Sequence, residues 1–117
     1  MHFAISATWG PTDPTRAALP FVFAASALQA GDTVTIMLFH DAVHLATAGT
    51  AAKLVPFGPP QRFEEVVAHA KATVLVCKPC AEVRHIAEAS LDERLKLAGM
   101  NDFHAAAARE DARVVTF

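Results

Sequence analysis

The chain has 117 residues, of which 53% are hydrophobic and 19% are charged, and its formal net charge is −2. This length accommodates one hydrophobic core, so we expect a single domain over residues 1–117, and the composition excludes a disordered or fibrous chain. The small negative charge, without any run of Lys and Arg, excludes a nucleic-acid backbone as a partner, and the scarcity of charged residues predicts apolar surface that is covered by homo-oligomerisation.

The first strand and the first helix have clear boundary residues. Residues 2–8 form a short apolar, β-compatible run, and the turn formers TWGPTDPT follow it. A helix is predicted over 14–30, because Asp13 is a good N-cap acceptor before Pro14 and Gly31 stands where a C-terminal cap belongs.

The second strand is predicted over 33–39, where a continuous apolar run indicates burial on both faces of a sheet. The segment HDAVH that follows begins a short helix or turn, with Asp41 as a candidate cap. Residues 47–60, rich in Gly and Pro, predict a long loop of the kind that often serves as a lid or binding segment.

The second half of the chain continues the alternation of helices and strands. A helix over 61–71, a strand over 73–77, a helix from Pro79 through Ala89, an unassigned stretch at 91–97, a helix over 102–110 capped by Asn101 and a strand over 112–117 are expected in this order. The alternation predicts an α/β domain: a single, mostly parallel sheet of about five strands with helices on both faces.

One segment superficially resembles a secretory leader. Arg16 precedes an apolar run that contains small residues. Pro20 interrupts this run, which is also too short to span a bilayer as a helix. We therefore expect a cytoplasmic protein with no membrane partner.

The two cysteines, Cys77 and Cys80, form a CxxC motif at the end of the third predicted strand. In an open α/β sheet, ligands bind at the edge where the carboxyl ends of the strands meet. The segments that carry Asp13, His40 and His44 follow the first two strands and should reach the same edge. The sequence therefore predicts a site that contains the CxxC motif.

A cysteine reacts as its thiolate, which nearby cations and a helix N-terminus stabilise. Lys78 is adjacent to Cys77, and Arg84 lies in the following helix, so we expect a lowered pKa for the Cys77 thiol. Cys80 is then placed to resolve a persulfide, sulfenate or mixed disulfide formed on Cys77. In the alternative interpretation both thiols are inert, with Cys77 ending a buried strand and Cys80 filling a helix face.

A metal site is a further alternative, since CxxC is half of a typical zinc site and His40 and His44 would share one face of a helix. A second cysteine pair is lacking, so we expect no resident metal or other cofactor. The serines lack a Gly-rich elbow, and Gly10 belongs to neither a GxGxxG motif nor a P-loop, so hydrolase and nucleotide-phosphate sites have no support.

Three features occur in a recognisable order: DPTR with the later strand GDTVTI, the block CKPCAEVR, and the terminal strand VVTF. Over essentially all 117 residues this order resembles the DsrE/DsrF-like family of small sulfur-relay proteins. The resemblance implies a compact α/β domain with a parallel sheet, assembly into dimers, trimers or hexamers, and a cysteine that carries sulfur as a persulfide between donor and acceptor proteins.

Carried onto this chain, the resemblance assigns the sulfur-accepting position to Cys77 and the second cysteine of a subset of members to Cys80. His85 occupies a position that is often Gly in such blocks, and we expect it to crowd or protonate the site. The resulting prediction is a sulfurtransferase-type carrier in which Lys78 and Arg84 stabilise the Cys77 thiolate. Two alternatives stay open: a non-catalytic binding or assembly subunit of the same fold, and a Cys/His metal-binding protein.

Overall fold

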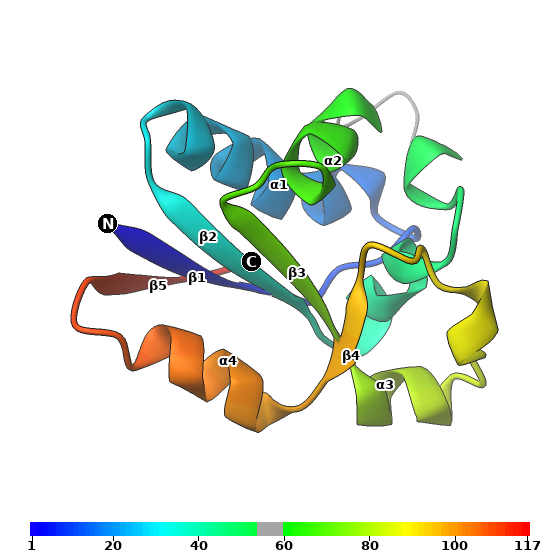
Figure 1. Cartoon of the computed structure of the whole chain (residues 1–117). Helices are drawn as coiled ribbons and strands as arrows, with labels where there is room; N and C mark the ends of the chain where they lie inside the picture. The colour runs from blue at the N-terminus through cyan, green and yellow to red at the C-terminus, as the bar shows by residue number, and fades with distance from the viewer. Residues whose placement is uncertain (54–59) are drawn as a thin grey trace.

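The computed structural model describes residues 1–53 and 60–117, so the middle of the predicted 47–60 loop lies outside the described residues. Five parallel strands form one sheet in the order β4-β3-β2-β1-β5 (Figure 1). Their bounds are β1 (His2–Ala7), β2 (Thr33–Leu38), β3 (Ala72–Cys77), β4 (Lys96–Ala98) and β5 (Ala112–Thr116). The prediction of a mostly parallel sheet of about five strands is confirmed.

Helices lie on both faces of this sheet, as predicted. They are α1 (Pro14–Gln29), α2 (Pro60–Val67), α3 (Lys78–Val83) and α4 (Met100–Ala107), with short 3₁₀ helices η1 (His40–Ala46), η2 (Ala51–Lys53) and η3 (Glu88–Ser90). Figure 1 shows α1 and α2 over one face, α4 across the other, and α3 beyond the carboxyl end of β3. Within the described residues, no helix has the length and apolarity that crossing a membrane requires.

The core is centred on β2, the middle strand. Its register places Ile36 between Ile5 of β1 and Val74 of β3, and all three side chains are at most 5% exposed. Burying each such side chain stabilises the fold by about 1.5–3 kcal/mol. The central strands, from whose carboxyl ends the loops leave, are therefore firmly held.

The boundaries of α1 agree with its capping residues. Asp13 is the N-cap and its carboxylate accepts a hydrogen bond from the backbone N–H of Arg16 at 3.2 Å, while Gly31 follows the helix at φ +93°. Positive φ is the conformation in which glycine carries no steric penalty. Both local signals act as the sequence predicts.

The predicted helix from Pro79 through Ala89 is wrong in its length, because α3 ends at Val83. His85 adopts φ +55°, and the backbone N–H groups of His85 and Ile86 donate to the carbonyls of Glu82 and Ala81, each at 3.0 Å. This pair of bonds is a Schellman motif, which closes a helix. The position that is often Gly in the resembling block is thus the left-handed residue of a helix cap.

Further boundaries differ from expectation, and α2 ends at Val67 rather than at residue 71. The last helix begins at Met100 with Gly99 as its N-cap, whose N–H donates to the Asp102 carboxylate at 2.9 Å, so Asn101 lies inside the helix. The stretch that the sequence left unassigned contains β4, which pairs with β3 through Lys96–Ala98. A strand of three residues has too little pattern to be recognised without its partner.

Candidate functional site

Three segments meet at the carboxyl edge of the sheet: the loop after β1, the 3₁₀ helix η1 after β2, and α3 after β3. A Cβ atom built on Gly10 would lie 2.3 Å from the backbone oxygen of Asp41, so only glycine permits this approach of the first loop to η1. Sequence reasoning assigned no role to Gly10. The only available signal was a single glycine in the loop that follows the first strand.

The two thiols differ in their surroundings. Cys77 ends β3 and is the residue before the first turn of α3, and it is 8% exposed, whereas Cys80 within α3 is only partly buried. Burial raises the pKa of the Cys77 thiol, as does the neighbouring Cys80 thiol, and these effects outweigh the lowering by the Cys80 backbone N–H and by the Arg84 charge. The expected lowering of the Cys77 pKa is therefore wrong.

Among the described residues, the side chain of Lys78 makes no hydrogen bond to either cysteine. Its side chain is 63% exposed, and its Nζ lies 4.0 Å from a carboxylate oxygen of Glu82, one turn along the same helix. An ion pair this exposed is screened by water. The predicted support from Lys78 for the Cys77 thiolate thus has no counterpart in these contacts.

Arg84 joins α3 to η1. Its Nε donates to Oδ1 of Asp41 at 3.0 Å, its Nη1 donates to the backbone carbonyl of Cys80 at 3.1 Å, and its Nη2 lies 2.8 Å from Nδ1 of His40. A guanidinium only donates, so Nδ1 of His40 accepts. The bond from Arg84 lowers the pKa of the Asp41 carboxyl. Arg84 is thus the residue that connects the His40 and Cys80 segments.

The backbone of His40 contacts the sulfur of Cys80, the less buried of the two thiols. Its N–H donates to Sγ of Cys80 at 3.2 Å, and its φ of +54° is rare for a residue with a Cβ. Residues held in this region cost about 1–3 kcal/mol and concentrate at functional sites. The cost at His40 is offset by the contacts with Cys80 and Arg84, which sequence reasoning did not anticipate.

The other predicted site residues lie outside these contacts. Asp13 caps α1, and its carboxylate lies 3.7 Å from Nε of Arg16. His44 is half-buried on η1, where its charge slightly lowers the pKa of Asp41. His85 is exposed at the cap of α3, and the described contacts do not place it against either thiol.

The metal alternative gains no support from this geometry. Among residues 1–53 and 60–117, no group of three or more His, Cys, Asp or Glu side chains is placed to hold a metal ion. Instead, the described contacts pair His40 with Arg84 and with the Cys80 sulfur.

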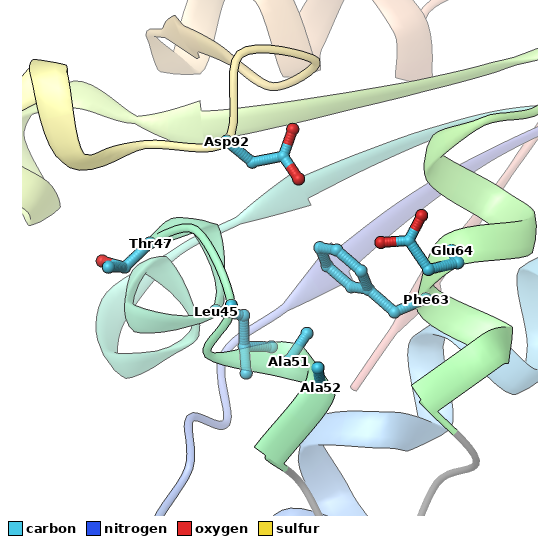
Figure 2. Close-up of a pocket in the computed structure, with 8 residues that line it drawn as sticks. Leu45, Thr47, Ala51, Ala52, Phe63, Glu64 and Asp92 are labelled. Carbon is cyan, nitrogen blue, oxygen red and sulfur yellow. The ribbon is translucent and has the colours of Figure 1, made fainter.

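A separate cavity of about 390 Å³ lies between η1, η2, α2 and the segment before β4 (Figure 2). Figure 2 shows Glu64 and Asp92 reaching toward the same space beside the ring of Phe63. Arg94 donates to both Glu64 oxygens at 2.7 and 2.9 Å and to both Asp92 oxygens at 2.9 and 2.7 Å. The two carboxylates that line this cavity are thus paired with Arg94, and neither cysteine is among its lining residues.

Comparison with known proteins agrees with this fold. The profile of the DsrE/DsrF-like family matches residues 1–117. The uncharacterized protein MJ0989 of Methanocaldococcus jannaschii is 34% identical over 120 residues, covering 100% of both chains.

Two solved structures share the fold. The ychN protein from E. coli superposes with a TM-score of 0.79 and 21% identity, covering 99% of this chain and 97% of that one. The protein of unknown function MTH1491 from Methanobacterium thermoautotrophicum superposes with a TM-score of 0.69 and 11% identity, covering 99% and 96%. Full-length agreement with the family profile and a relative above 30% identity establish the assignment. The chain belongs to the DsrE/DsrF-like family.

Proposed function

We propose that this protein carries sulfane sulfur as a persulfide on its Cys77–Cys80 pair. Family membership supports a role of the sulfur-relay type. The observation that carries the proposal is the hydrogen bond of 3.2 Å from the His40 N–H to Sγ of Cys80, beside the Arg84 guanidinium. An N–H donor at a sulfur atom stabilises the anionic thiolate and persulfide more than their neutral forms.

The transfer needs no external oxidant. A thiolate of the pair attacks the outer sulfur of a donor persulfide, R–S–SH; a new S–S bond forms, the donor S–S bond breaks, and RS⁻ leaves with its electron pair. An acceptor thiolate attacks the outer sulfur of the carrier persulfide in the same way. The partners are therefore a donor and an acceptor, each presenting a thiol or a persulfide.

We also propose that the chain assembles as a homo-oligomer, a dimer, trimer or hexamer. Large apolar side chains are exposed on both sides of the sheet: Leu19 and Val22 on α1, and Met100 and Val114, 62% and 52% exposed, on the α4 side. Apolar surface of this kind favours burial against another subunit. Sedimentation equilibrium of the purified protein tests this, and a monomer at micromolar concentration would contradict it. A cytoplasmic location stays a prediction from the sequence.

A second candidate function, a non-catalytic assembly subunit with inert thiols, is favoured by one observation. Cys77 is 8% exposed and its pKa is raised by burial, as for a structural cysteine. This candidate predicts slow alkylation of both thiols and no change on replacing both by Ser.

The test is mass spectrometry of the reduced protein after incubation with glutathione persulfide. Early in the incubation we expect a gain of one sulfur atom, about 32 Da, on the wild type and on the control variant Lys78→Gln, whose side chain is exposed. The double variant Cys77→Ser/Cys80→Ser should gain none. A wild type that neither gains sulfur at any time nor releases sulfide refutes the carrier function and leaves the assembly subunit.

A further inference from the structure

We propose that Cys80 is the thiol that accepts sulfur and that Cys77 is a buried resolving thiol, which expels the sulfur as hydrosulfide and leaves a Cys77–Cys80 disulfide. This order is the reverse of the one that the resemblance implies. The inference rests on the proposed carrier function and assigns each thiol its step.

The two cysteines differ in how accessible they are to a donor persulfide. A donor persulfide must bring its outer sulfur into line with the attacking sulfur, and thiol exchange depends on which sulfur is reachable. Cys77 is 8% exposed at the end of β3, immediately before the first residue of α3, whereas Cys80 within α3 is more exposed. The first sulfur transfer from a bulky donor therefore takes place at Cys80.

The charges of the site favour the same order. The His40 N–H reaches Sγ of Cys80 at 3.2 Å, and the Arg84 guanidinium bonds to the carbonyl of Cys80 and to the ring of His40. The N–H donor stabilises a negative charge that develops on Cys80 or on its persulfide, and Arg84 holds His40 and the Cys80 carbonyl in place. Burial raises the pKa of Cys77, so that thiol keeps its proton while Cys80 is loaded.

The position of the two cysteines on α3 supplies the second step. Cys77 is the N-cap of α3 and Cys80 is the third residue of its first turn, a CxxC spacing at which the Cys77 thiol can reach the inner sulfur of a Cys80 persulfide. The Cys77 proton moves to the outer sulfur, the Cys77 thiolate attacks Sγ of Cys80, and the Cys77–Cys80 bond forms. The bond between the inner and outer sulfurs breaks, and HS⁻ leaves with the electron pair.

The electrons balance within the site. The sulfane sulfur gains two electrons and becomes sulfide, while the two thiols lose two and become a disulfide. A further cycle then requires a reaction that reduces this disulfide, such as exchange with an external dithiol. An acceptor thiolate that reaches the Cys80 persulfide first receives the sulfur instead, so sulfide release and intact transfer compete.

The experiment compares the single variants Cys77→Ser and Cys80→Ser with the wild type and with Lys78→Gln. Each reduced protein receives glutathione persulfide, and both intact mass and free sulfide, trapped with monobromobimane, are followed over time. Glutathione disulfide alone serves as the control for mixed disulfides that release no sulfide. Circular dichroism and thermal midpoints establish that each variant is folded, and Cys80→Ala replaces Cys80→Ser if the latter is not.

We expect Cys77→Ser to retain a stable adduct of about 32 Da without releasing sulfide, and Cys80→Ser to load at least about tenfold more slowly. The wild type and Lys78→Gln should release one sulfide and end as the intramolecular disulfide. Normal loading of Cys80→Ser with failure of Cys77→Ser overturns the assigned order. A stable wild-type adduct without sulfide overturns the resolving step. Both results keep the carrier function, which fails only if the wild type never loads.

Discussion

Replacing Gly10 by Ala tests the close approach on which the site depends. The new Cβ would lie 2.3 Å from the backbone oxygen and 2.9 Å from the carbonyl carbon of Asp41, whereas ordinary van der Waals contact begins at 3.4 Å. The backbone of the first loop or of η1 must therefore move by about 1 Å. Because both clashing atoms belong to the main chain, a side-chain rotation does not relieve the overlap.

The size of the effect follows from this geometry. Overpacking costs about 1–3 kcal/mol, and a clash against backbone belongs at the upper end, so we expect the free energy of unfolding to fall by about 2–3 kcal/mol. For a domain of this size the thermal midpoint should drop by roughly 6–12 °C. Displacement of Asp41 should also weaken the bonds of Arg84 and of the His40 N–H. The rate at which iodoacetamide alkylates Cys80 should change as a consequence.

The assay is urea unfolding followed by circular dichroism, together with the rate of iodoacetamide alkylation mapped to each cysteine. Gly99→Ala is the matched control, because a Cβ at Gly99 meets no atom within 4 Å and that residue has extended backbone. The free energy of unfolding of Gly99→Ala should fall by no more than about 1 kcal/mol, as for an N-cap substitution. If Gly10→Ala is no less stable than Gly99→Ala, the reasoning about the first loop and η1 is refuted.

Three further predictions concern single side chains. His85→Gly should raise the free energy of unfolding in urea by about 0.5–1 kcal/mol, since φ is +55° there, and a loss would contradict the cost of this conformation. Burial and the Arg109 charge lower the pKa of His2, so the stability that neutral His2 contributes should be fully present above pH ~6.5 and fall as the pH drops toward the folded-state pKa. His2→Asn should therefore make the urea midpoint depend less on pH between pH 5 and 7.5. An unchanged dependence of the midpoint on pH would exclude His2 as the cause. Arg84→Lys should slow sulfur loading about tenfold, because Lys lacks the planar fork that joins Asp41 to His40; wild-type loading rates would remove Arg84 from the site.

Much of the fold could be predicted because its signals lie close together in the chain. The caps of α1 at Asp13 and Gly31, and the apolar runs of β2 and β3, act through neighbouring residues or through a period that a short window contains. The end of α3 has a local cause too, but a left-handed cap occupied by His85 carries no glycine to reveal it. The strand β4 needed its partner β3 to be recognised.

The sequence by itself indicated the family, through the resemblance carried by its DPTR, CKPCAEVR and VVTF segments. It also determined the parallel sheet and the position of the CxxC motif at the carboxyl edge, because these follow from the order of apolar runs and turn residues. Tertiary structure alone decided how the two thiols differ. Arg84 reaches Asp41 across 43 positions, and the His40 N–H reaches Cys80 across 40, while burial outweighs the effect of the Arg84 charge on the pKa of Cys77. Desolvation and long-range hydrogen bonds depend on which segments the fold brings together, and spacing along the chain carries no record of them.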